Sequence, residues 1–123
     1  MDAAIHFDEG LVVVRTTGTA RARTLEDIVG VVVDDPRFEI GMPMLFDHSE
    51  LAVGELNAYD IRGIAEAFLS REDDLGHGRK AIVVPGDAAY GLARMFAVYA
   101  ESDRLHVAVF RDRESAVAWL MET

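Results

Sequence analysis

The sequence predicts an α/β fold in which a β-hairpin is followed by alternating helices and strands, in the order ββαβαβαβα. Two observations favour it: short apolar, β-branched runs recur along the chain, and segments with helical spacing of apolar residues lie between most of them. This alternation predicts a mostly parallel sheet, here of five strands packed against four helices. A chain of 123 residues is long enough for one core, so we expect residues 1–123 to form a single domain.

The first two strands are predicted to form an antiparallel hairpin. Ala3–Phe7 and Leu11–Thr17 are apolar and rich in β-branched residues. Between them Asp8-Glu9-Gly10 supplies a turn, with glycine available where a positive φ is required.

A first helix is predicted after this hairpin. Thr24 is its expected N-cap, and Pro36 lies beyond its end. Its expected buried face consists of Leu25, Ile28, Val29 and Val32. The valine-rich run is also compatible with a strand, because β-branched residues favour strands.

The middle of the chain is predicted to hold a short strand, a helix and a loop. Pro43–Asp47 is the apolar strand, and Asn57 is placed to cap the helix that follows. The loop is expected over Asp73–Lys80, which contains two glycines. The apolar positions at helical spacing are Ile61, Ile64, Ala65 and Phe68.

The last third of the chain is predicted to hold two further buried strands, Lys80–Pro85 and His106–Phe110. Asp87 is the expected cap of the helix between them, and Asp112 or Ser115 begins the last helix. The inner residues of these helices are expected to be Leu92, Met95, Phe96, Tyr99, Ala116, Trp119 and Leu120. The core positions expected with most weight are Phe68, Val83, Phe96, Val109 and Trp119.

Charge and composition exclude several classes of function. A net charge of −10 argues against nucleic acid as a partner and against charge-driven binding to an anionic membrane. Without cysteine, neither disulfides nor thiolate catalysis can occur. The densest apolar run, Ile28–Val33, is too short for membrane insertion, and the acidic N-terminus is unlike a signal peptide. We therefore expect a soluble cytoplasmic protein.

Two segments carry a resemblance to a known family. They are MPMLFDHSELAVGELNAYDIRGIAEAF and RKAIVVPGDAAYGLARMFAVYAESDRLHVAVFRDRESAVAWL. Residues 11–121 resemble small bacterial proteins of the STAS-like superfamily, whose best-known members are anti-sigma-factor antagonists and whose fold class includes lipid carriers of the CRAL-TRIO type. The most specific part is the C-terminal pattern of strand, GLARMF, a strand ending VFRD, and ESAVAWL. The resemblance implies a STAS-like fold rather than a catalytic activity.

One feature of the antagonists is missing from the matching segment. In that family a serine at a helix start, after a strand with an acidic end, is phosphorylated by a partner kinase. Here Pro43–Asp47 matches the strand, but the helix start near Asn57 and Tyr59 has no serine, and LNAYDIRG replaces a DSSGL-like segment. The resemblance therefore implies an interaction or regulatory module without the usual phosphorylatable serine.

Asp47, His48 and Ser49 stand side by side after an apolar run. They form a candidate binding location, because open α/β sheets hold ligands at the carboxyl ends of their strands. A nucleophile with its base is not expected: adjacent residues in an extended segment point to opposite sides, and there is no GxSxG elbow. The alternative is a loop in which Asp47 and Ser49 bond nearby backbone N–H groups. We predict no catalytic residue.

Other motifs give weaker signals. The four histidines lack metal-binding spacing and no glycine-rich phosphate motif is present, so we predict no metal and no cofactor. PGDAAYG offers backbone N–H groups to an anion, but Asp87 competes for them as a cap. Tyr59 and Tyr90 fall outside the inner helix stripes, which marks either a partner interface or ordinary exposed residues. The candidate ligand- or partner-binding residues are Asp47, His48, Ser49, Asn57, Tyr59 and Tyr90.

Three hypotheses of function remain open. The first is a non-enzymatic interaction module that binds a protein partner or itself, as a homodimer. The second is a carrier of a lipid or small apolar ligand, supported by the fold kinship and by five methionines. The third is an enzyme acting at the Asp47–Ser49 loop, for which the sequence implies no substrate.

Overall fold

The computed structural model describes residues 1–122 and contains one five-stranded sheet in the order β1–β2–β3–β4–β5. β1 (Asp2–Asp8) pairs with β2 (Leu11–Thr19) in antiparallel orientation. β3 (Met44–Ala52), β4 (Arg79–Val83) and β5 (His106–Phe110) follow, each parallel to the strand before it. The predicted hairpin and the mostly parallel sheet are confirmed.

The hairpin turn explains why this stretch carries a glycine. Asp8 and Leu11 are paired, so the turn consists of Glu9 and Gly10, which have φ values of 49° and 82°. Two successive positive φ values are those of a type I′ turn, whose twist matches that of the two strands.

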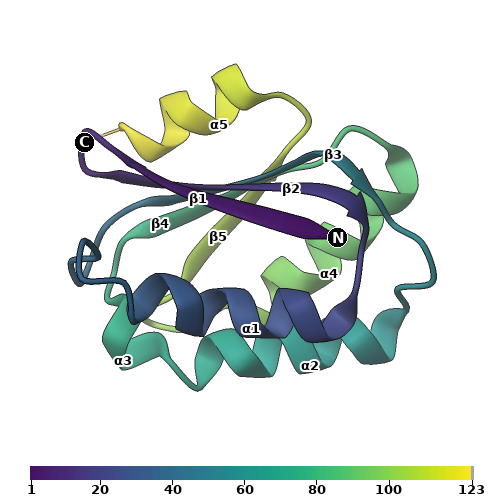
Figure 1. The fold of residues 1–123 in the computed structure, drawn as a ribbon, viewed down its shortest axis with the longest axis horizontal. Helices are drawn as coiled ribbons and strands as arrows, with labels where there is room; N and C mark the ends of the chain where they lie inside the picture. Colours follow the sequence, from purple (N-terminus) through teal and green to yellow (C-terminus); the bar gives the residue numbers. More distant parts are fainter. Residues whose placement is uncertain (123) are drawn as a thin grey trace.

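Helices lie on both faces of the sheet, in unequal number (Figure 1). α1 (Ala22–Val33), α2 (Ala58–Leu69) and α4 (Asp87–Ala100) cover one face, which we call the helix-layer face. α5 (Arg113–Leu120) lies alone on the other, the α5 face. Because the chain moves in one direction from β2 to β5, right-handed crossovers place the connecting helices on the same face.

Each face of the sheet has its own apolar cluster. Side chains alternate along β3, so Phe46 belongs to the larger cluster on the helix-layer face. Leu45 belongs to the smaller cluster on the α5 face, together with Ala116 and Leu120 of α5.

The caps of two helices are as predicted. Asn57 Oδ1 accepts from Asp60 N at 3.0 Å, and Asp60 Oδ2 accepts from Asn57 N at 3.2 Å, which forms a capping box at the start of α2. Asp112, rather than Ser115, is the N-cap of α5, and its Oδ1 accepts from Ser115 N at 2.8 Å.

Two other predicted caps are wrong. α1 begins before Thr24, and its N-cap residue Arg21 has no side-chain cap. Asp87 is the first residue of α4 instead of its cap, which is Gly86, and the Asp87 carboxylate accepts from Arg111 Nη1 at 2.8 Å. Both helices bury an apolar stripe, and this packing stabilises them without a side-chain cap.

Two predicted boundaries are also wrong. β3 does not end at Asp47 but continues to Ala52, because β2 pairs with it as far as Thr19. The predicted loop Asp73–Lys80 instead contains most of a short helix, α3 (Glu72–Leu75), and the start of β4. The chain therefore has five helices instead of the four predicted.

Burial differs from the prediction near the sheet edge. β5 is an edge strand, so Val109 is half-buried rather than core. Trp119 is half-buried too, since α5 covers its face alone. The fully buried residues of α4 are Ala93, Phe96 and Ala100, while the predicted Leu92, Met95 and Tyr99 are partly buried beside them. The other expected core positions, Phe68, Val83 and Phe96, are confirmed.

Candidate functional site

Asp47, His48 and Ser49 lie within β3, and their side chains separate onto the two faces of the sheet. The β2–β3 register passes from Arg15 opposite Asp47 to Thr17 opposite Glu50, so β3 contains one extra residue at this point. Ser49 Oγ is 2.6 Å from Asp47 Oδ1 on the α5 face. His48 lies on the helix-layer face, so it forms no nucleophile–base pair with Ser49.

Asp47 is only 3% exposed, yet its carboxylate is charged at neutral pH. Ser49 N and Oγ donate to its Oδ1 at 3.0 and 2.6 Å. Arg15 Nε and Arg113 Nη1 lie 3.9 and 3.5 Å from its Oδ2. Burial alone would raise the pKa of Asp47, but the bonds from Ser49 and the two guanidinium charges together hold this pKa below its usual value.

His48, in contrast to the charged Asp47, is uncharged at neutral pH. Its Nδ1 is 2.6 Å from the hydroxyl of Thr16, a residue with no exposed surface. The ring lies beside Phe46, with 6.3 Å between the ring centroids. Burial lowers the pKa of His48 to about 4, against the smaller opposing effect of the Asp47 charge. The imidazole is therefore neutral at neutral pH.

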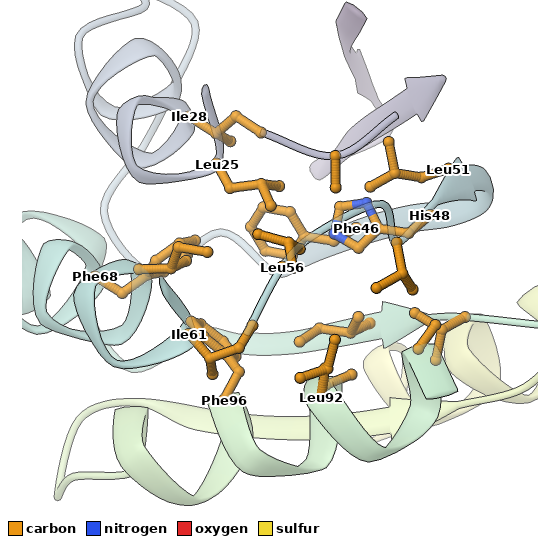
Figure 2. A pocket seen from close by; sticks show the side chains of 17 residues that line it. Leu25, Ile28, Phe46, His48, Leu51, Leu56, Ile61, Phe68, Leu92 and Phe96 are labelled. Atoms are coloured by element: carbon orange, nitrogen blue, oxygen red, sulfur yellow. The ribbon is translucent and has the colours of Figure 1, made fainter. Parts of the chain in front are cut away.

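His48 lines an apolar cavity of about 90 Å³ beneath the helix layer (Figure 2). Phe46, Phe68 and Phe96 form its buried part, and the Phe68 ring makes edge contacts with the other two. Among the lining residues in the part of the chain that the structure describes, His48 is the only one with a polar side chain. The others are Ala20, Leu25, Ile28, Leu51, Val53, Leu56, Ile61, Ile64, Ile82, Val84, Ala89, Leu92 and Ala93.

The partly exposed lining residues mark the mouth of the cavity. Leu51, Val53 and Leu56 follow His48 along β3 and the loop to α2, and Ala89 and Leu92 begin α4. This is the carboxyl end of the parallel strands, where α/β sheets place their ligands. The mouth therefore lies at the edge that the sequence indicated.

The loop at the mouth is tied to the start of α1. Ala20 N donates to Ala52 O at 2.8 Å. Gly54 has a φ of 61°, and a Cβ there would lie 2.5 Å from Thr19 Cγ2. Glycine thus allows the loop to pass close to β2, and the capping box at Asn57 holds the other end of the loop.

The remaining predicted site residues do not reach the cavity. Asn57 is exposed and caps α2, next to the lining residue Leu56. Tyr59 is 86% exposed. Tyr90 is half-buried, and the Arg111 guanidinium lies 4.2 Å from the centre of its ring. Of the six predicted residues, only His48 lines the cavity.

Sequence reasoning missed most of this site. Phe46, Phe68 and Phe96 belong to ordinary apolar stripes, and no pattern distinguishes residues that line a cavity from residues that fill a core. Thr16 gave no signal either, because its chain neighbours Arg15 and Thr17 are polar as well.

Metal sites and membrane-spanning helices are both absent from the described part of the chain. Within residues 1–122, no group of three His, Asp or Glu side chains is arranged to hold a metal ion. In the same range, no helix combines the length and the apolar character needed to cross a bilayer.

Solved structures with a similar fold include that of an uncharacterized protein of the DUF3478 family from Shewanella loihica PV-4, with a SpoIIAA-like fold. The two align with a TM-score of 0.60 and 14% sequence identity over 97% of this chain and 92% of that one. At this identity the likeness shows the fold alone, and it confirms the STAS-like fold that the sequence predicted. No family model matches the chain, and no curated protein does.

Proposed function

We propose that the protein binds a small, largely apolar molecule in the cavity beneath its helix layer. The supporting observation is the cavity itself: about 90 Å³ of space lined by apolar side chains, with one imidazole and a mouth at the carboxyl end of the strands. Small-molecule sites have this composition, in which apolar walls provide affinity and a few polar groups fix orientation.

The volume argues for an occupant. Protein interiors are close-packed, and few voids exceed the size of a water molecule. The wall of an apolar cavity of about 90 Å³ lacks the packing contacts that side chains make in a filled core. A ligand that fills the cavity restores these contacts.

Thermal unfolding with methylcyclopentane as the probe tests this proposal. We expect the melting temperature to rise with probe concentration, because a ligand that binds only the folded state stabilises it. Ala93→Leu places extra side-chain atoms in the cavity and should abolish the rise. The matched control is Ala97→Leu, on the same helix but away from the lining, and it should keep the rise. An equal response of both variants would contradict the proposal.

A second candidate function is a non-enzymatic interaction module, with a protein partner or a second copy of the chain. Exposed apolar side chains favour it: Tyr59 is 86%, Ile40 73% and Val98 68% exposed. The charge of −10 fits a basic partner protein and a cytoplasmic location. Native mass spectrometry of the protein from its own cells tests this candidate. An added protein mass that Tyr59→Ser removes would support it, and a bare monomer would oppose it.

Catalysis at Asp47–Ser49 is not part of the proposal. Ser49 and His48 lie on opposite faces of the sheet, and the Asp47 carboxylate is engaged by Ser49, Arg15 and Arg113.

A further inference from the structure

We infer that the cavity selects an uncharged ligand with one hydrogen-bond donor, such as a hydroxyl group, which donates to Nε2 of His48. This inference rests on the proposed function and deepens it, because it names the chemical class of the ligand. It follows from the bonds of Thr16, from the position of Nε2 and from the character of the cavity wall.

The Thr16 hydroxyl sets the tautomer of His48. Thr16 Oγ1 lies 2.6 Å from His48 Nδ1 and 3.4 Å from the carbonyl oxygen of Asp47. A hydroxyl has one proton to donate, and a carbonyl oxygen can only accept. Both contacts are satisfied when Thr16 donates to Asp47 O and accepts from Nδ1–H. In the other tautomer Thr16 donates to Nδ1 and the contact with Asp47 O is lost. The first arrangement therefore leaves Nε2 without a proton, as an acceptor.

Nε2 is the ring atom available to a ligand. Within residues 1–122 the only hydrogen bond of the ring is the one at Nδ1. No buried side-chain nitrogen or oxygen in this range lacks a partner, so Nε2 is reached by solvent. Because the ring lines the cavity, this solvent-reached nitrogen is offered at the cavity (Figure 2).

The wall excludes a charged ligand group. From β2 the polar neighbour of His48 is Thr16, which is neutral. The lining side chains from α1, α2 and α4 are apolar, and the Asp47 carboxylate with its two arginines lies on the α5 face. Burial keeps the imidazole neutral as well. A carboxylate or an ammonium group would therefore be desolvated without a partner of opposite charge.

The experiment compares three probes of similar size by NMR titration of the full chain. Cyclopentanol has a donor, cyclopentanone has only an acceptor, and methylcyclopentane has neither. The three probes share a five-membered ring, and the cavity of about 90 Å³ opens to solvent at its mouth, so the ring need not be fully enclosed. We expect cyclopentanol to bind about tenfold more tightly than cyclopentanone, because only the alcohol satisfies Nε2.

Two variants test the role of each side chain. Thr16→Val keeps the shape of the side chain and removes the group that sets the tautomer, so the preference for the alcohol should fall to about twofold or less. His48→Leu should abolish the preference while methylcyclopentane still binds.

The outcomes separate this inference from the proposed function. Equal or tighter binding of cyclopentanone, while all three probes bind, would overturn the inference and leave the proposed function standing. If none of the three probes bound the wild-type chain, the proposed function itself would fail.

A second readout needs no ligand. The ¹⁵N chemical shifts of a histidine ring distinguish a protonated from an unprotonated nitrogen. We expect His48 to carry its proton on Nδ1 in the free protein at neutral pH. A proton on Nε2 would overturn the inference whatever the affinities are.

Discussion

On the helix-layer face, α1, α2 and α4 bury a large apolar cluster, a cavity and one neutral imidazole. On the α5 face, one helix covers a smaller cluster, and a nearly buried carboxylate is paired with two half-exposed arginines. β3 supplies both polar groups from neighbouring residues, His48 and Asp47. The pKa of each lies below its usual value. Above its pKa an imidazole is neutral and a carboxyl group is charged, so His48 is neutral and Asp47 is charged at neutral pH.

The number of helices that cover each face of the sheet goes together with the polar group found beneath them, His48 on one face and Asp47 on the other. Around His48 the other residues that line the cavity are apolar, and burial of the ring favours its neutral form. Under one short helix, the long side chains of Arg15 and Arg113 reach Asp47 from solvent. A cavity that binds neutral molecules therefore suits the helix-layer face, and ion pairs suit the α5 face.

The largest effect is expected from Phe68→Ala on the helix-layer face. Phe68 is 5% exposed and its ring packs against Phe46 and Phe96. Truncation should lower the free energy of unfolding by about 3–5 kcal/mol. Urea unfolding measures this change, with Phe68→Leu as a control that should lose much less. A loss below 1 kcal/mol would mean that this face is not the main source of stability.

Acid should weaken the helix-layer face through His48. The unfolded chain binds a proton near pH 6.5, while the folded protein holds the ring neutral down to about pH 4. Stability is therefore full above pH 6.5 and falls between pH 6.5 and 4, by about 2–3 kcal/mol. Urea midpoints across this range measure the loss, and His48→Gln should remove that part of the pH dependence. An unchanged pH profile in His48→Gln would show that other groups cause the loss.

Lys80 is a second polar group of the helix-layer face, at the amino end of β4. It is 1% exposed, its Nζ donates to Gly78 O, and it forms no ion pair within the described residues 1–122. Burial lowers the pKa of Lys80 to about 8. Below pH 8 the folded state holds a buried charge, and this cost disappears as the pH rises through 10.5.

Lys80→Met should therefore stabilise the protein at pH 7, by about 2 kcal/mol, and the gain should vanish above pH 10.5. Urea unfolding at the two pH values measures both effects. A loss of stability at pH 7 would show that the bond to Gly78 O outweighs the cost of burying the charge.

The fold could be predicted from the sequence because its signals are local. The hairpin turn at Glu9 and Gly10, the cap at Asn57 and the apolar stripe of α2 each specify one element without reference to the rest. The alternation of strands and helices then limits how these elements can be arranged. The short helix α3 was missed because its four residues are too few for a periodic pattern.

The candidate site could be predicted only in part, because a cavity depends on several elements at once. The sequence indicated a candidate location at Asp47–Ser49, where His48 lines the cavity, and the separation of His48 from Ser49 by alternation. It gave no sign that Phe46, Phe68 and Phe96 leave space between them, since apolar spacing is the same in a filled core. The length of β3 beyond Asp47 depends on pairing with β2, which one segment alone does not reveal.

Trp119→Ala probes the α5 face. Its effect on stability should be smaller than the effects described above for Phe68, His48 and Lys80. The sequence places Trp119 in the core, but the residue is half-buried, between Phe110 at 5.7 Å and the Arg79 guanidinium at 5.0 Å from its ring centre. We expect a loss of about 1–2 kcal/mol, below the full cost of a buried aromatic side chain. Because Arg79 Nη1 also donates to Trp119 O at 2.7 Å, Arg79→Lys is a useful companion variant. If Trp119→Ala were as costly as Phe68→Ala, α5 would stabilise the sheet as much as the three helices opposite, and the contrast between the two faces would be wrong.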